Sequence, residues 1–237
     1  GILVMDGKYV AVKGYDQKIP FIYGIDYLTH DIPLGNLYAA EDEMAFVTFF
    51  ARLKELGYPL RAVVADDRSG LKPALLRVFP NARLQRCHVH YLENLRKNLN
   101  IRTEKQYRDF FYTLRRIFRK ARNEDQVLLE LKFIREKTKS RLLLNILQDV
   151  EHRKEALFAF RQIPDYPNST NLIESYNSHL NGRLKTIKGF QSFISAKAWL
   201  NAYAIRRRTK ALTDCKGKFK VLNKHASLEL TIKKQAR

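Results

Sequence analysis

Residues 61–87 read RAVVADDRSGLKPALLRVFPNARLQRC, and this stretch decides the fold class. Residues 61–65 are short, apolar and β-prone, which is typical of a buried strand that ends at Asp66. Residues 71–79 have apolar side chains at helical spacing and end at a proline. Residues 82–87 indicate another strand. A strand, a helix and a strand in succession predict an α/β fold with right-handed crossovers between parallel strands.

Three more strands and a helix are predicted upstream of this stretch. Residues 2–12, 19–26 and 32–40 are apolar runs separated by polar residues, glycine or proline, which predicts a three-stranded meander. Residues 41–58 have helical spacing and reach a stop at Gly57. We therefore expect a mixed sheet, a meander followed by parallel strands, in which the fourth strand lies close beside one of the first three.

Downstream, residues 88–160 contain helical patterns without a strand signal. We predict two further helices beyond a loop at residues 165–169, and one short strand near the C-terminus. These patterns divide the chain into a first part of the α/β core, an all-α insertion, the helices that complete the core, and a basic tail: residues 1–93, 94–165, 166–212 and 213–237. The helices of the insertion are expected at residues 90–100, 107–121, 125–139 and 140–160, the later pair at 171–186 and 191–210, and the strand at 228–232.

The net charge of +20 is distributed unevenly along the chain. Residues 1–93 contain 11 basic and 11 acidic side chains, residues 94–160 contain 17 and 9, and residues 183–220 contain 11 and 1. Solvated helical faces usually mix both signs, so this asymmetry favours a surface that binds nucleic acid. No apolar run is long enough to cross a membrane, no signal peptide opens the chain, and two cysteines cannot build a disulfide framework.

We therefore expect an intracellular protein, in the cytoplasm or nucleoid if its source is prokaryotic, without membrane contact. The first residue already lies in a predicted strand, so we also expect a segment upstream of it.

Two carboxylates interrupt or end apolar strands. Asp6 lies within the first strand, where a carboxylate is costly unless it is hydrogen-bonded, paired or bound to a metal ion. Asp66 lies at the end of the fourth strand, and ligands of open α/β sheets gather at such ends. Asp67 is the rival to Asp66, because adjacent residues of a strand point to opposite faces. We prefer Asp66.

A third carboxylate, Glu174, lies in the predicted helix at residues 171–186. Glu174, Asn177 and Asn181 recur at i, i+3 and i+7, so they form one polar stripe that is expected to face the sheet. The alternative is that Glu174 only caps its own helix, in a capping-box pattern with Asn171. Three carboxylates would suit two Mg²⁺ or Mn²⁺ ions, which prefer oxygen ligands and catalyse phosphodiester cleavage as a pair.

Two longer segments resemble a known family. Residues 63–95, VVADDRSGLKPALLRVFPNARLQRCHVHYLENL, are similar to the signature of the Mutator-like transposases and related bacterial insertion-sequence transposases. The shared features are an Asp at a strand end, Gly-Leu, Phe-Pro closing a helix, and Cys-x-x-His. Residues 169–193, STNLIESYNSHLNGRLKTIKGFQSF, resemble the segment of the same family that carries its final Glu.

The resemblance implies an RNase H-like fold with a catalytic Asp-Asp-Glu triad, which would be Asp6, Asp66 and Glu174. It also implies a mobile-element enzyme, an endonuclease and strand transferase that cleaves transposon ends and joins them to target DNA. A homo-oligomer is expected, because two ends must be joined. Such transposases usually carry a DNA-binding region near the N-terminus, and the resemblance leads us to expect that region outside the residues of this chain.

Cys87 and His90 have the spacing of half a zinc site, but the remaining Cys and His residues are scattered and offer no second pair. We therefore do not expect zinc. The resemblance makes Cys87-x-x-His90 a motif near the active site, and His90 is expected to contact DNA or the metal-bound phosphate. Asp67, Cys87, Asn177 and Asn181 are accessory candidates.

Basic residues of the last two helices are candidates for phosphate contacts, which position DNA rather than read its sequence. Trp199 lies among them at helical spacing and is interpreted as a core residue. The candidates are Arg183, Lys185, Lys188, Arg206, Arg207, Arg208 and Lys210. Two other functions were weighed, a domesticated relative that binds DNA without cutting it and a stand-alone RNase H-like nuclease. The intact triad favours the transposase.

Overall fold

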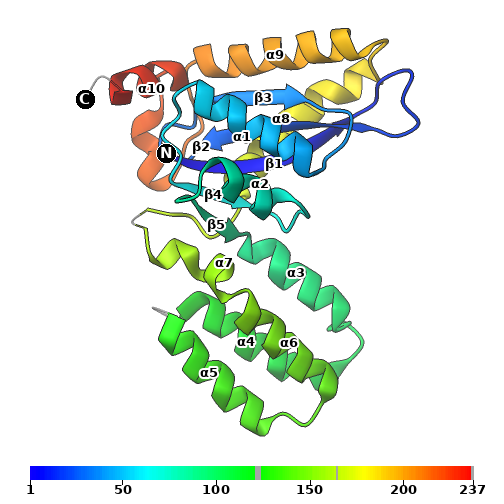
Figure 1. Cartoon of the computed structure of the whole chain (residues 1–237), viewed down its shortest axis with the longest axis vertical. Coiled ribbons are helices and arrows are strands. Elements are labelled where there is room, and N and C mark those ends of the chain that lie inside the picture. Colours follow the sequence, from blue (N-terminus) through cyan, green and yellow to red (C-terminus); the bar gives the residue numbers. More distant parts are fainter. Residues whose placement is uncertain (121–123, 164, 236–237) are drawn as a thin grey trace. The chain divides into compact units, whose positions relative to one another are not determined.

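A computed structural model describes residues 1–120, 124–163 and 165–235 of the chain. It is an α/β structure with a five-stranded sheet in the order β3-β2-β1-β4-β5 (Figure 1). The predicted meander is confirmed, since β1 pairs antiparallel with β2, and β2 with β3. The fourth strand neighbours the first in the sheet order. The strands are β1 (Ile2–Val10), β2 (Ile19–Asp26), β3 (Leu34–Leu37), β4 (Ala62–Ala65) and β5 (Arg83–Arg86).

The chain forms two compact units. Unit 1 comprises Gly1–Val63, Arg68–Ala82 and Thr170–Arg237, and unit 2 comprises Val64–Asp67 and Arg83–Ser169. The chain therefore passes from one unit to the other within β4. Ala121 of the predicted helix 107–121, Pro164 of the predicted insertion and the last two residues of the predicted basic tail lie outside the described residues.

Unit 1 contains the meander and five helices among its described residues. The Asp42 carboxylate caps the first of these helices by accepting a hydrogen bond from the backbone N–H of Ala45 at 2.8 Å. The first two helices pack on each other, the third packs against β1 and β2, and the fourth against β3. In chain order they are α1 (Glu43–Glu55), α2 (Leu71–Val78), α8 (Asn171–Ile187), α9 (Phe193–Thr209) and α10 (Ser227–Gln235).

The prediction of a strand at residues 228–232 is wrong, because this segment lies inside α10. Leu, Glu, Leu, Thr and Ile alternate as they would in a strand. In the structure Ser227 and Thr231, four residues apart on one helical face, donate hydrogen bonds to the Asp31 carboxylate at 3.2 and 2.9 Å. Asp31, a buried residue far away in the sequence, therefore favours a helix over a strand at residues 228–232.

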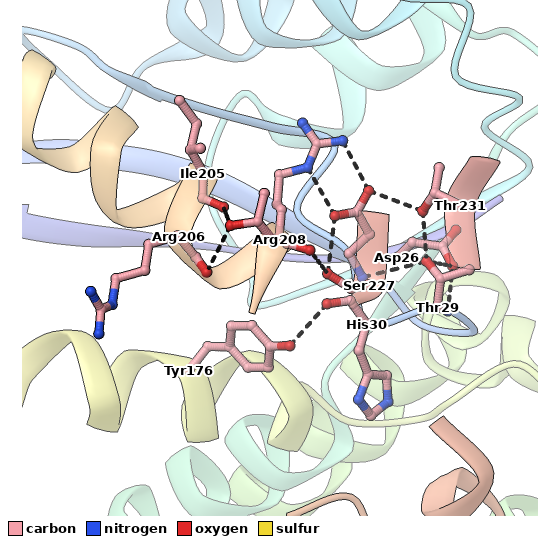
Figure 2. A network of polar contacts seen from close by, with 11 residues as sticks. Asp26, Thr29, His30, Tyr176, Ile205, Arg206, Arg208, Ser227 and Thr231 are labelled. Carbon is pink, nitrogen blue, oxygen red and sulfur yellow. Dashed lines mark hydrogen bonds and ion pairs between the residues drawn. The ribbon is translucent and has the colours of Figure 1, made fainter. Parts of the chain in front are cut away.

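A buried polar network centred on Asp31 joins the loop after β2 to α9 and α10. Figure 2 labels Arg208, Ser227 and Thr231 among its members. The Asp31 carboxylate is 1% exposed and accepts two hydrogen bonds from the Arg208 guanidinium, at 2.9 and 3.0 Å. Asp26 organises the turn between β2 and Asp31, because its carboxylate accepts hydrogen bonds from the N–H groups of Leu28 and Thr29. This network fixes the C-terminal segment onto unit 1.

Unit 2 is helical apart from the end of β4 and β5, as far as the structure describes it. Its core is formed by apolar side chains from several helices, including Leu95, Phe110, Leu114, Leu131 and Leu147. In Figure 1 the helices of this unit follow β5 in colours from teal to yellow-green. They are α3 (His88–Asn98), α4 (Arg108–Lys120), α5 (Glu124–Lys137), α6 (Arg141–His152) and α7 (Lys154–Phe158), with 3-10 turns before α4 and after α7.

No helix in the described part of the chain combines the length and apolar character needed to cross a membrane.

Candidate active site

Asp6 lies on β1 and contacts the helix that covers this face of the sheet. Its Oδ2 accepts a hydrogen bond of 2.7 Å from the Asn177 side-chain amide on α8, and its Oδ1 accepts one from the N–H of Gly7. Tyr23, directly opposite Asp6 on β2, donates its hydroxyl to the Asn177 Oδ1 at 2.8 Å. Burial raises the pKa of Tyr23 well above its usual value, so the hydroxyl stays protonated and remains a donor. Asn177 is therefore held in the orientation that presents its amide to Asp6.

Glu174 lies on the first turn of α8, one turn before Asn177. Its Oε1 accepts a hydrogen bond of 2.9 Å from the hydroxyl of Thr170, the N-cap residue. Thr170 makes no side-chain cap hydrogen bond to the helix backbone, so the reciprocal capping box is not formed. The carboxylate is exposed and lies at a helix N-terminus, where the positive end of the dipole stabilises it.

Asn181 follows Asn177 by one turn on α8 and is half-buried. The stripe predicted at residues 174, 177 and 181 thus lies on one helix that packs against β1 and β2. Within unit 1, Asp6 and this stripe supply carboxylate and amide oxygens, which are ligands suited to hard divalent cations.

Unit 2 holds a second cluster, formed by Asp66, Cys87 and His90. One ligand atom from each of the three lies within 4.8 Å of the others. The His90 Nδ1 lies 2.7 Å from the Asp66 Oδ1. The N–H of Cys87 donates to the carbonyl of Ala65 at 2.9 Å, which ties the start of α3 to the end of β4. Because Cys87 and His90 are the N-cap and third residue of α3, this one bond positions both side chains near Asp66.

Asp67 has different partners. Its Oδ2 forms ion pairs with the guanidinium groups of Arg86 and Arg153. Arg153 in turn pairs with Asp149 at 2.6 Å, so Asp67 belongs to a network of arginines and carboxylates within unit 2. Its role is thereby distinguished from that of Asp66, whose partner is an imidazole.

The basic candidates separate into two groups. Arg207 and Arg208 are half-buried: the Arg207 guanidinium lies 4.5 Å from the centre of the Tyr176 ring, and Arg208 pairs with Asp31. Trp199, interpreted from the sequence as a core residue, is half-buried and packs on Phe190 and Tyr203. The exposed candidates are Arg183, Lys185, Lys188, Arg206 and Lys210.

Three contacts of the site involve residues that sequence reasoning did not select, namely Tyr23, Thr170 and Arg153. Tyr23 is identified by the strand register, which aligns it with Asp6. Thr170 is the N-cap of α8, so a prediction of where that helix begins could have identified it. Arg153 gave no signal, because it lies 86 residues from its partner Asp67.

Comparison with known proteins finds transposases of insertion sequence elements among the relatives of this chain. The chain is 27% identical over 213 residues to the transposase for insertion sequence element ISRM5 of Rhizobium meliloti (strain 1021), covering 86% of this chain and 52% of that protein. It is 28% identical over 177 residues to the transposase for insertion sequence element IS256 in transposon Tn4001 of Staphylococcus aureus, covering 69% and 42%. The same protein from Enterococcus faecalis (strain ATCC 700802 / V583) gives the same values.

The chain therefore spans about half, or less, of the length of these curated relatives. The sequence profile described as "Transposase, Mutator family" matches residues 3–207, which is most of the chain. On this match, the chain belongs to the Mutator family of transposases.

Proposed function

We propose that this chain is the catalytic core of a DNA transposase with an RNase H-like fold. In this proposal Asp6, Asp66 and Glu174 bind two Mg²⁺ or Mn²⁺ ions. The reaction is cleavage of DNA at transposon ends followed by strand transfer into target DNA. DNA is the partner, and a homo-oligomer holds the two ends inside the cell.

The observation that carries the proposal is the hydrogen bond from Asn177 to Asp6. It joins β1 to α8 one turn from Glu174, so two residues 168 positions apart are carried by elements in direct contact. If this Asp–Asn hydrogen bond lay on the solvated surface, it would need no functional explanation. Here the amide is itself oriented by Tyr23, a 1% exposed residue, so the Asp6 carboxylate is held in one position.

Asp66 is proposed as the third carboxylate for two reasons. It follows β4, the strand next to β1 in the sheet order, so Asp66 at the end of one strand and Asp6 in the middle of the other are carried by neighbouring strands. Its rival, Asp67, is engaged by Arg86 and Arg153. An arginine pair makes a carboxylate a poor ligand for a cation, because the positive charges compete for the same oxygens.

The residues present fit hard divalent cations, because Asp6, Asp66 and Glu174 offer carboxylate oxygens. When bound, such ions would activate the attacking oxygen and stabilise the leaving oxygen of the phosphodiester. Asn177 would keep Asp6 in one rotamer, and His90 would do the same for Asp66. We propose Cys87 as the residue that anchors the start of α3, and Asn181 as a further polar residue of the stripe.

Cleavage of a supercoiled plasmid tests the proposal, using a plasmid that carries the DNA flanking this coding sequence. We expect nicked and linear products with Mn²⁺ or Mg²⁺ and none with EDTA. Asp66→Asn should lower the cleavage rate by at least about a thousandfold, because loss of a carboxylate ligand removes transition-state stabilisation of several kcal/mol. Asp6→Asn and Glu174→Gln are expected to behave in the same way.

Asp67→Asn is the matched control, since it changes the adjacent residue by the same chemistry. We expect it to lower thermal stability through its arginine partners while the folded protein still cleaves. DNA binding without cleavage by the wild type would identify a DNA-binding relative without catalytic activity, and equal cleavage by wild type and Asp66→Asn would refute the role of Asp66. Cleavage without joined products, tested with a pre-cut 3′-OH duplex and a target plasmid, would identify a stand-alone nuclease.

A further inference from the structure

One face of α4 in unit 2 is a continuous stripe of cations. Arg115, Arg116, Arg119 and Lys120 are exposed and recur at i, i+1, i+4 and i+5, so they share one side of the helix. The opposite side faces the core through Phe110, Phe111, Leu114, Ile117 and Phe118, all of them buried. Core packing therefore fixes the orientation of the helix, and with it the direction of the four cations.

These four cations have no carboxylate partner among residues 1–120, 124–163 and 165–235, although other arginines of unit 2 do. Arg96 pairs with Glu93 at 2.6 Å and Arg153 pairs with Asp149 at the same distance. The spacing also places like charges three and four residues apart, which destabilises a helix. Favourable interaction with the helix dipole explains only the two cations in the last turn. The two in the middle of the helix require another explanation.

The stripe is continuous with hollows in the surface of unit 2. One hollow lies on α4 and is lined by the four cations together with Tyr112, whose side chain is 54% exposed. A second lies between α3 and α4 and shares Tyr112 and Arg115 with the first. Arg102 and Arg108 line this second hollow and add to the positive charge. The face is thus concave, cationic and partly aromatic.

We propose that this face, defined by Tyr112, Arg115, Arg116, Arg119 and Lys120, binds the phosphate backbone of duplex DNA. Arginines are suited to phosphates because their planar groups donate paired hydrogen bonds, and a row of cations along one helix matches a row of phosphates. The exposed tyrosine provides a surface that packs against sugars at low entropic cost. The inference rests on the proposed function for the choice of DNA as partner, and it adds a binding face on unit 2 that lies outside the triad.

Fluorescence anisotropy with a short labelled DNA duplex tests this face, with EDTA present so that cleavage cannot contribute. The test variant carries Arg115→Gln, Arg116→Gln, Arg119→Gln and Lys120→Gln. Each phosphate contact changes the slope of log Kd against log salt by about 0.9, so loss of four should lower the slope by about 3 to 4. The dissociation constant near physiological salt should rise at least about tenfold.

The matched control removes four exposed cations elsewhere on unit 2 by Lys132→Gln, Lys137→Gln, Lys139→Gln and Arg141→Gln. It changes the net charge equally, and its slope should change by less than about 1. Equal changes in both variants, or no change in the test variant, would overturn the proposal. Tighter binding of an RNA duplex of the same sequence would overturn the choice of DNA.

Two further measurements keep the outcome interpretable. If the fourfold variant is unstable, the pair Arg115→Gln and Arg116→Gln should still lower the slope by about 2. Cleavage by the wild type and the binding slope of the fourfold variant separate the two proposals. No plasmid cleavage by the wild type, together with a lowered slope for the fourfold variant, would refute the proposed enzyme and leave the binding face intact. Plasmid cleavage by the wild type, together with an unchanged slope for the fourfold variant, would refute the binding face and leave the enzyme intact.

Discussion

The arginines at the end of α9 and those on α4 are used in opposite ways. Arg208 points into unit 1 (Figure 2). Its Nε and Nη2 donate hydrogen bonds to the two oxygens of the buried Asp31 carboxylate. Arg115, Arg116 and Arg119 of unit 2 point outward, and no carboxylate pairs with them among the described residues. Arginine thus stabilises the fold at the end of α9, whereas on α4 its positive charge remains available for binding. A run of basic residues in a sequence does not distinguish these roles.

Replacing Asp31 tests the inward arginine and is expected to have the largest effect. Asp31→Ala leaves Arg208 half-buried without its partner and removes an acceptor from Ser227 and Thr231. Breaking a buried pair in this way should lower the free energy of unfolding by roughly 3–5 kcal/mol. Urea unfolding measures it, and the exposed Arg206→Ala should change the same quantity by less than about 0.5 kcal/mol. A loss below about 1 kcal/mol for Asp31→Ala would contradict the comparison.

A buried histidine gives unit 2 an expected sensitivity to pH, because burial disfavours the protonated form of its imidazole. Burial lowers the pKa of His88 from 6.5 to about 4, while its hydrogen bond with the Leu157 carbonyl opposes the shift. A lowered folded-state pKa contributes stability above pH 6.5 that is lost as the pH falls towards 4. Between pH 7 and 4.5 the wild type should lose about 2 kcal/mol from this group.

His88→Gln should remove that component, so its stability should depend less on pH than the wild type's. Urea unfolding at both pH values gives the difference for each protein. His30 is present in both proteins, and burial also lowers its pKa to about 4, so its contribution cancels. The same loss in both proteins would show that His88 is not responsible.

The outward arginines are expected to have the smallest effect on stability. Arg115→Gln with Arg116→Gln should change the free energy of unfolding by less than about 0.5 kcal/mol, or raise it slightly by relieving like-charge repulsion. Urea unfolding at low and high salt measures this, since salt screens the repulsion. A loss of about 2 kcal/mol, the order expected when a buried group loses its partner, would mean that these arginines stabilise the fold.

Much of the fold could be predicted from the sequence. The three-stranded meander followed from apolar runs with turn residues between them, and α1, α2, α8 and α9 from helical spacing. The segment at residues 228–232 was mispredicted because local alternation favoured a strand, whereas Asp31 holds it as a helix. Strand ends were less accurate too: β3 is Leu34–Leu37 rather than residues 32–40.

The candidate site was less accessible to sequence reasoning. The polar stripe on α8 was visible as a spacing, but the partner of Asn177 depends on register, which aligns Tyr23 with Asp6. The choice of Asp66 over Asp67 rested on the position of Asp66 at the end of the fourth strand and on the alternation of side chains along that strand. The contacts of Arg86 and Arg153 with Asp67 depend on how distant helices pack, which no local pattern contains.

The division of unit 1 around unit 2 has a consequence for synthesis on the ribosome. The chain changes units after residues 63, 67, 82 and 169, so every segment of unit 2 has been made before α8, α9 and α10 emerge. Unit 2 is therefore able to close its core while the first-made strands still lack the helices that cover them. The first strands of this chain are therefore covered last, and the nascent sheet is the surface we expect chaperones to protect in the meantime.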